Sequence, residues 1–194
     1  MEKRWIKAAT ILPPTLKVCG RNLLPFCLKH RVALESINSP VLNVSGKITP
    51  RDLLFAVRIL STYNIEETRK SMTLRESFLL VLYSVNQARF LREVFKLNVY
   101  FNAQSLWPRF WEKSGTGSAA EIPWPLTIIA GLVRNGVSLA EAWQMPESEA
   151  VWLHIANCKA NGAKVDLVSE TEWDAMQRYM NDQKLDSSKS INRN

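Results

Sequence analysis

Two pairs of cysteine and histidine residues have a spacing that could build a metal site. Cys27 and His30 are separated by two residues, and His154 and Cys158 are separated by three. On a helix, either spacing brings two potential zinc ligands to one face about one turn apart, and together the pairs would complete a tetrahedral set. However, the paired spacing of a zinc finger is absent, and His30 falls within an apolar stripe where a packed histidine is ordinary. We therefore predict no metal and no cofactor.

Other constellations that could perform catalysis are incomplete. A cysteine nucleophile needs a base and an orienting group, and the spacing of Cys19, Cys27 and Cys158 fixes neither. The glycine-containing stretch 114–118 lacks the lysine and the strand-to-helix context of a phosphate-binding loop. We therefore predict that the protein is not an enzyme.

The composition is that of a folded, soluble protein. The chain has 194 residues, of which 46% are hydrophobic, enough to bury a core. Its three widely spaced cysteines do not suggest a disulfide framework and favour a reducing compartment. Pro13 and Pro14 interrupt the N-terminus before an apolar block of signal-sequence length, and the longest apolar stretch, 78–83, is too short to span a bilayer. We expect a cytoplasmic protein without a membrane partner.

The net charge of +7 is distributed unevenly. Residues 1–113 contain 18 Lys and Arg against 8 Asp and Glu, a net +10, whereas residues 114–194 contain 7 against 10, a net −3. The Gly, Ser and Ala composition of residues 114–121 is typical of a flexible linker. We therefore predict a basic helical domain at 1–113, a linker at 114–121, a tryptophan-rich helical domain at 122–180 and a disordered tail at 181–194.

Signals for helices dominate the basic part of the chain. Residues 15–19 alternate in polarity and end at a glycine, which predicts a short strand and turn, and residues 24–37 then place apolar side chains on one helical face. Capping boxes at Thr49 and Thr73 open two further helices, the second and longest of which we extend over 74–97. The predicted fold class is mainly α, with two small helical modules and a short β element near the N-terminus.

The helix predicted at 74–97 is apolar on more than one side. One stripe consists of Leu74, Phe78, Val81, Leu82, Val85 and Ala88, and Leu79, Leu80, Phe90 and Val94 lie off it. Such a helix is either central to its own domain or partly covered by another chain. The first arrangement is the ordinary one for a helix in a four-helix module, and the second stays open.

The tryptophan-rich part is divided into short helices with clear starts and stops. An apolar stripe at 126–133 ends near Gly136, a capping box follows at Ser138, and a third helix runs from Pro146 to Gly162. An extended segment at 163–168 and a last helix from 169 to about 180 complete the prediction.

The helices within 126–157 could also form a helix-turn-helix, and a pI near 9.5 suits DNA. The local charge argues against this, because the only formal charges in the segment are Arg134 against Glu141, Glu147 and Glu149, and this net negative charge would repel phosphate groups. A polyanion could still meet the basic first part through Arg51, Arg58, Arg69, Lys70, Arg75, Arg89 and Arg92. A DNA-associated helix-turn-helix-like regulator is therefore our alternative prediction.

Two residue patterns, one in each half of the chain, carry a family resemblance. The first is Leu16-Lys-Val-Cys-Gly-Arg-Asn-Leu-Leu-Pro-Phe-Cys-Leu-Lys-His30, followed by Ala33-Leu34, Ser39-Pro40 and Asp52-Leu53. The second is Gly136-Val-Ser-Leu-Ala-Glu-Ala-Trp143, followed by Met145-Pro-Glu-Ser-Glu-Ala150 and Trp152. Over roughly residues 15–175, these packing and capping patterns resemble the tail assembly chaperones of tailed phages and prophages.

The resemblance implies a non-enzymatic assembly factor in the cytoplasm of a bacterial host. Such chaperones coat the hydrophobic tape-measure protein and bring tail-tube subunits to it. Here the helix at 74–97 would contact the tape-measure protein or a second copy of the chain, and tryptophans would anchor the tube subunit. The partner-binding residues so predicted are Phe78, Leu82, Phe90, Val94, Trp124, Trp143 and Trp152. For Trp143 and Trp152, a place in the core is the competing prediction.

Overall fold

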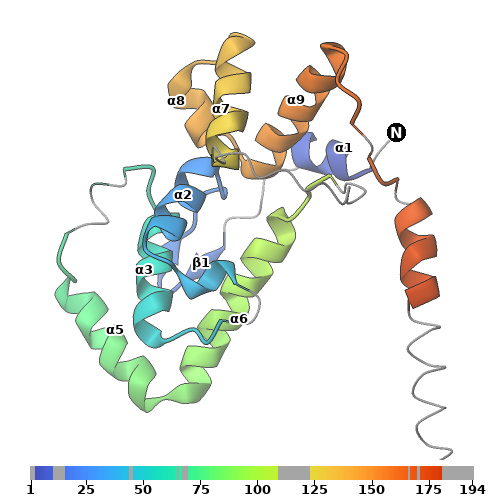
Figure 1. Cartoon of the computed structure of the whole chain (residues 1–194). Coiled ribbons are helices and arrows are strands. Elements are labelled where there is room, and N and C mark those ends of the chain that lie inside the picture. The colour runs from blue at the N-terminus through green and yellow to red at the C-terminus, as the bar shows by residue number, and fades with distance from the viewer. Residues whose placement is uncertain are drawn as a thin grey trace, which may run out of the picture.

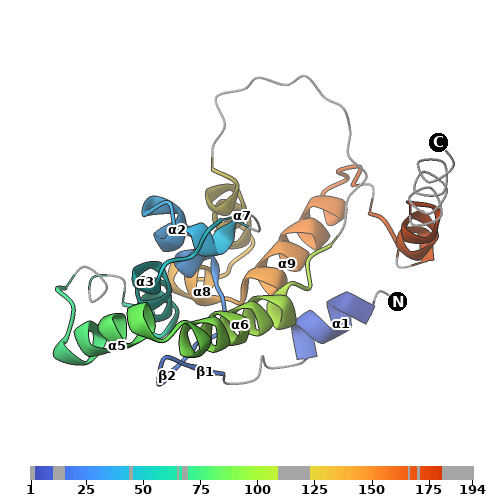
Figure 2. The same cartoon turned by 90° about the horizontal axis from the view of Figure 1, so that it is seen from below.

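In a computed structural model, the chain is mainly helical and has one small antiparallel sheet near the N-terminus, which confirms the predicted fold class (Figures 1 and 2). The structure describes residues 3–10, 16–43, 46–64, 66, 70–108, 123–165, 167–169 and 171–180. The predicted linker at 114–121 and the predicted tail at 181–194 lie outside these residues. In the described ranges, no helix combines the length and the apolar character needed to cross a membrane.

The helices and strands follow one another along the chain. They are α1 (Lys3–Thr10), β1 (Lys17–Val18), β2 (Arg21–Asn22), α2 (Leu28–Ser36), the 3-10 helix η1 (Pro40–Leu42), α3 (Pro50–Leu60), α5 (Leu74–Val85), α6 (Gln87–Gln104), α7 (Trp124–Arg134), α8 (Leu139–Gln144), α9 (Glu147–Ala160) and a last helix at 171–180. The two strands pair through a turn at Cys19 and Gly20, which have positive φ values of 49° and 77°. Two successive positive φ values suit the right-handed twist of a tight hairpin.

Three helix starts lie where their capping boxes predict them. Thr49, Thr73 and Ser138 each accept a hydrogen bond from the backbone N–H three residues later, and the acidic side chain at that later position accepts one in return. These bonds satisfy backbone donors that the first turn of a helix otherwise leaves unpaired. The starts of α3, α5 and α8 are therefore determined by local sequence.

The prediction of a single helix over 74–97 is wrong, because the structure has two helices that meet at Asn86. The backbone of Asn86 leaves the helical region, with φ −109° and ψ 86°, and its side-chain oxygen accepts a hydrogen bond of 3.0 Å from the N–H of Arg89. This bond caps α6, which continues to Gln104. In Figure 1, α5 and α6 form the two arms of a V, with α3 between them.

Two clusters of buried apolar side chains form the interior. The first surrounds α3 and includes Leu53, Val57 and Leu60. The second joins α7, α8 and α9 and includes Ile129, Leu132, Ala142, Ala150 and Ile155. Helix α2 serves both, because Leu34 is buried in the first cluster and Leu28 in the second.

The two clusters meet where α9 begins. Cys27 and Pro146 form an isolated antiparallel bridge, and the N–H of Glu147 donates to the carbonyl of Phe26 at 2.8 Å. One turn further along α9, the indole Nε1 of Trp152 donates to the carbonyl of Leu106 at 2.8 Å. Backbone and side chain thus hold the start of α9 against α2 and against the segment that follows α6.

Candidate functional site

The cysteine and histidine residues with metal-ligand spacing do not gather into one cluster. His30 is buried, with Nε2 3.0 Å from the carbonyl oxygen of Thr62, whereas Nε2 of His154 lies 3.6 Å from Sγ of Cys158. In the part of the chain that the structure describes, no three His, Cys, Asp or Glu residues are grouped to hold a metal ion. Burial raises the pKa of the Cys27 thiol to about 11, opposite to the shift that activates a nucleophile.

Large apolar side chains are exposed along α5 and α6. On α5 they recur at spacings of four, three and four residues, and on α6 at spacings of four. Their exposed fractions are 92% for Leu74, 67% for Phe78, 65% for Val81, 83% for Val85, 54% for Leu91, 67% for Phe95 and 41% for Val99. We call these seven residues the outer face. Apolar surface of this kind on a folded protein is typical of sites of interaction.

The outer face is the side of α5 and α6 that the protein's own core leaves uncovered. On α5, the partly buried Leu79, Leu80 and Leu82 and the buried Tyr83 pack against the cluster around α3. On α6, Leu97 and Tyr100 are buried in the same cluster. The two helices are therefore apolar on both sides, and only one side contributes to the fold.

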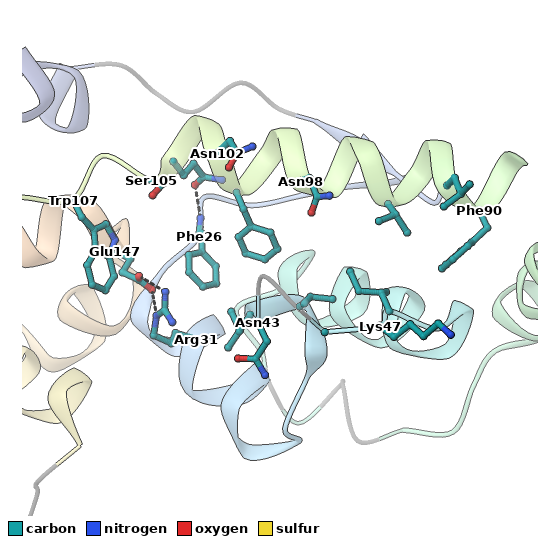
Figure 3. A pocket seen from close by; sticks show the side chains of 18 of the residues that line it. Phe26, Arg31, Asn43, Lys47, Phe90, Asn98, Asn102, Ser105, Trp107 and Glu147 are labelled. Atoms are coloured by element: carbon teal, nitrogen blue, oxygen red, sulfur yellow. Dashed lines mark hydrogen bonds and ion pairs between the residues drawn. The ribbon is translucent and has the colours of Figure 1, made fainter. Parts of the chain in front are cut away.

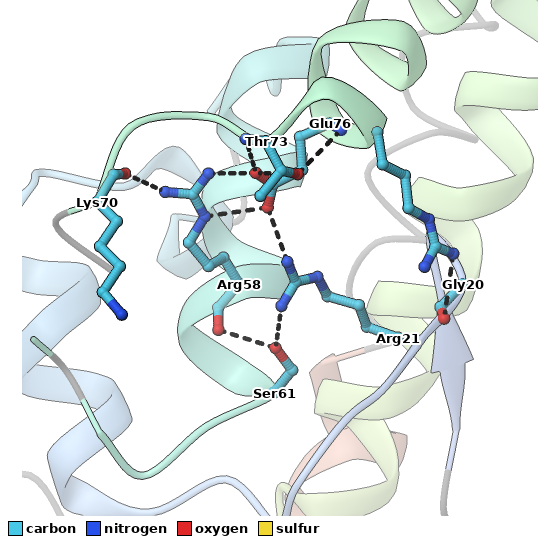
Figure 4. A network of polar contacts seen from close by, with 8 residues as sticks. Gly20, Arg21, Arg58, Ser61, Lys70, Thr73 and Glu76 are labelled. Carbon is cyan, nitrogen blue, oxygen red and sulfur yellow. Dashed lines mark hydrogen bonds and ion pairs between the residues drawn. The ribbon is translucent and has the colours of Figure 1, made fainter. Parts of the chain in front are cut away.

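A buried polar network fixes the start of α5 (Figure 4). The carboxylate of Glu76 accepts hydrogen bonds of 3.0 Å from Nε of Arg58 and from Nη2 of Arg21, and a further short bond from Nη2 of Arg58. Burial raises the pKa of Glu76, but the hydrogen bonds from Arg58 and Thr73 outweigh it and lower the pKa to about 2. Because Arg58 lies on α3 and Arg21 on β2, the network ties α5 to both elements.

Within residues 70–108, which carry the outer face, the exposed charges have one sign. Residues 70–108 contain two carboxylates, Glu76 and Glu93, and both are buried. Glu93 accepts hydrogen bonds of 2.6 Å from Lys96 and 2.7 Å from the N–H of Cys19. The cations of the same segment are Lys70, Arg75, Arg89, Arg92 and Lys96.

A groove of about 930 Å³ lies between α6 and the segment around η1 (Figure 3). Its apolar wall is formed by Phe26, Val41, Leu42, Ile48, Phe90, Leu91, Val94 and Phe101. Its polar lining includes the side chains of Asn43, Lys47, Asn98, Asn102 and Gln104, and Trp107 lies at the end formed by Arg31 and Glu147. Leu91 belongs to both the groove and the outer face, so the two surfaces are continuous.

The four partner-binding residues predicted on the first module lie in three settings. Phe78 is at the centre of the exposed row on α5. Leu82 is partly buried against the core around α3, whereas Phe90 and Val94 are partly buried and line the groove. The structure thus places one of the four on the outer face and two beside it.

The three predicted tryptophans are distributed between surface and core. Trp124 is exposed to 37% and stacks edge to face on Trp107, with 5.1 Å between ring centroids. Trp143 packs partly buried against the second cluster, and Trp152 is buried. The guanidinium of Arg31 lies 5.2 Å from the Trp124 ring centroid and 5.3 Å from that of Trp107.

Sequence reasoning missed the part of the outer face on α6. Leu91, Phe95 and Val99 recur every four residues, which places them on one side of a helix. This spacing stands out only when α6 is treated as a separate helix that begins after Asn86. In a single helix counted from residue 74, it merges with the apolar pattern of α5.

Comparison of the chain with protein-family models, with curated proteins and with solved structures finds no match.

Proposed function

We propose that the protein is a non-enzymatic assembly factor that binds other polypeptides through its outer face. The exposure of seven large apolar side chains on two consecutive helices is the observation that carries this proposal. Full burial of one such side chain stabilises a complex by about 1.5–3 kcal/mol. In the free protein these side chains are exposed and contribute nothing to its core. A partner that covers them would explain why they are apolar.

The family resemblance gives this factor a specific role, that of a tail assembly chaperone of a tailed phage or prophage. The tape-measure protein would lie on the outer face, and tail-tube subunits would be recruited by the tryptophan-rich part, in the cytoplasm of the bacterial host. Trp124 is the exposed anchor of that part, because Trp152 is buried and Trp143 partly so. The mainly helical fold and the capped helices α3, α5 and α8 support the role.

The setting of α9 favours a polypeptide partner over duplex DNA. In a helix-turn-helix, the first residues of the recognition helix enter the major groove. The corresponding residues of α9, Glu147, Ser148, Ala150 and Val151, are buried. A regulator of the alternative kind would have to separate α9 from α2 before its first turn could reach base edges.

Co-purification tests the proposal directly. The tagged protein would be co-expressed with the tape-measure and tail-tube proteins of the same genome, as wild type, as the double variant Phe78→Ser/Val85→Ser and as Leu139→Ser. Leu139 on α8 is exposed to 58% and serves as a matched control outside the outer face. We expect wild type and Leu139→Ser to retain the tape-measure protein and the double variant to lose it. Equal retention by all three, or no retention by wild type, would overturn the proposal.

A further inference from the structure

We infer that the outer face takes an amphipathic helix whose apolar stripe is flanked by acidic residues. This inference rests on the proposed function and specifies the chemistry of the partner that the outer face recognises. It follows from the spacing of the apolar residues, from the chemistry of a helical surface and from the sign of the surrounding charges.

The apolar residues of α5 have the spacing found in one helix of a coiled coil. Leu74, Phe78, Val81 and Val85 follow one another by four, three and four residues, as alternate core positions of a heptad do. Over the 12 residues of α5, this row is about 18 Å long and matches three turns of a second helix. The Glu76 network ties α5 to α3 and β2, so the row is held ready for docking.

A helix fits this surface better than an extended segment does. A helix satisfies its own backbone N–H and C=O groups, so it can be laid on apolar side chains without losing hydrogen bonds. The backbone of α5 is likewise satisfied internally and has no free row of donors and acceptors to offer. An extended segment would leave its own backbone groups unpaired against Phe78 and Val81, which is costly.

The charges around the row select for acidic flanks. Arg75 precedes Phe78 by three residues, and Arg92 precedes Phe95 by three, so each exposed phenylalanine has an arginine beside it on the helix surface. Arg75 also approaches the carbonyl oxygen of Gly20, at 3.4 Å. The carboxylates of the segment, Glu76 and Glu93, are buried and paired with cations. Glutamates flanking a partner's stripe would therefore meet positive charge on both helices, which confers selectivity more than affinity.

Two other occupants fit less well. A second copy that presented its own outer face would bring further arginines to the interface and no exposed carboxylate of residues 70–108 to pair with them, and like charges at an interface are repulsive. A nucleic acid would be attracted by the arginines and could stack on Phe78 and Phe95, but the other five side chains of the outer face are aliphatic and cannot stack on bases. The acidic helix uses both the charges and the aliphatic side chains.

Designed peptides test the inference with the full-length protein. One fluorescent peptide of about three heptads would carry leucine at the core positions and glutamate beside them, and its counterpart would carry lysine in place of glutamate. We expect the glutamate peptide to bind about tenfold more tightly at low salt. Arg75→Glu/Arg92→Glu should reverse the preference, Phe78→Ser/Val85→Ser should weaken binding of the glutamate peptide at least about tenfold, and Leu139→Ser should change neither result.

Each result that would contradict the inference can be told apart from the others. Equal binding of both peptides would overturn the acidic chemistry while the co-purification experiment still supported the proposed function. Displacement of the glutamate peptide by a single-stranded or duplex oligonucleotide would overturn the inference in favour of nucleic acid. A dimer detected by sedimentation, and abolished by Phe78→Ser/Val85→Ser, would overturn it in favour of a second copy.

Discussion

The guanidinium of Arg31 donates two hydrogen bonds, of 2.6 and 2.7 Å, to the carboxylate of Glu147, although the residues lie 116 positions apart in the chain. Glu147 is the first residue of α9 and is buried, whereas Arg31 lies on α2 between aromatic rings. A bidentate pair of this geometry fixes both distance and orientation. Together with the backbone bond from Glu147 to Phe26, it holds the part of the chain that carries Trp124 against the part that carries the outer face.

Breaking this pair should destabilise the protein strongly. Arg31→Met leaves the charge of Glu147 buried without its partner, and we expect the free energy of unfolding to fall by about 3–5 kcal/mol. The double variant Arg31→Met/Glu147→Leu removes both charges and should recover most of that loss. Urea denaturation followed by tryptophan fluorescence measures both values, and Arg92→Met provides an exposed control. A loss below about 1 kcal/mol in Arg31→Met would contradict a structural role for the pair.

The Glu76 network predicts a loss of stability in acid. The pKa of Glu76 is lowered from its ordinary 4.5 to about 2 in the folded protein, so the ionised carboxylate stabilises the fold above pH 4.5. This contribution is lost progressively as the pH falls from about 4.5 to about 2, because the unfolded chain binds the proton first. Thermal melts between neutral pH and pH 3 should show the decline.

The variant Glu76→Gln tests the assignment of that decline. It should lower the melting temperature at neutral pH and flatten the acid dependence between pH 4.5 and 3, because glutamine does not titrate. Glu141→Gln is the matched control, since Glu141 also completes a capping box but is exposed, and it should leave most of the acid dependence in place. An unchanged pH profile in Glu76→Gln would show that other groups cause the decline.

The parts of the fold that could be predicted from sequence are those with local causes. Thr49, Thr73 and Ser138 each stand three residues before an acidic side chain, and the bonds that start the helix form within that short span. The pairing of Arg31 with Glu147 has no such local signal. It depends on α2 and α9 meeting in space, and nothing in the residues near either partner specifies the other.

The outer face could be predicted only in part, for a related reason. Periodicity placed Phe78 and Val81 on one side of the helix and Leu79 and Leu80 on another, but both sides are apolar. Which side the core covers depends on where α3 packs, and the sequence of α5 alone does not say. The row on α6 was missed because the apolar pattern continues through Asn86. Without the cap in view, the two helices look like one.

The cap at Asn86 should have a measurable effect. Asn86→Ala removes the side-chain oxygen that accepts from the N–H of Arg89, and we expect a loss of about 1 kcal/mol in the free energy of unfolding. Gln87→Ala, at the neighbouring exposed position, should change the stability by less than about 0.5 kcal/mol. Urea denaturation of both variants measures the two losses in the free energy of unfolding. An equal effect at both positions would argue that Asn86 does not end one helix and begin the next.

Trp152 should act on stability and not on binding. Trp152→Phe removes the indole N–H that donates to the carbonyl of Leu106 and should cost about 1–2 kcal/mol. Affinity for the glutamate peptide should stay within about twofold of wild type, because Trp152 is buried on α9 and is not one of the seven residues of the outer face. Phe78→Ser should show the opposite pattern, with weak binding and little change in stability. If Trp152→Phe lost peptide binding at unchanged stability, Trp152 would belong to the partner site.

The close approach of α7 to α9 gives the last prediction. A Cβ at Gly131 would lie 2.5 Å from Nδ1 and 2.9 Å from Cε1 of His154, so Gly131→Ala forces the imidazole or the helix to move. We expect it to destabilise the protein by about 1–3 kcal/mol, although alanine is the better helix former by about 1 kcal/mol. Removing the ring should reverse the sign: in a His154→Ala background, the clash is absent and Gly131→Ala should stabilise the protein by up to about 1 kcal/mol. A double-mutant cycle measured by urea denaturation gives this coupling, and additive effects would show that Gly131 and His154 do not touch.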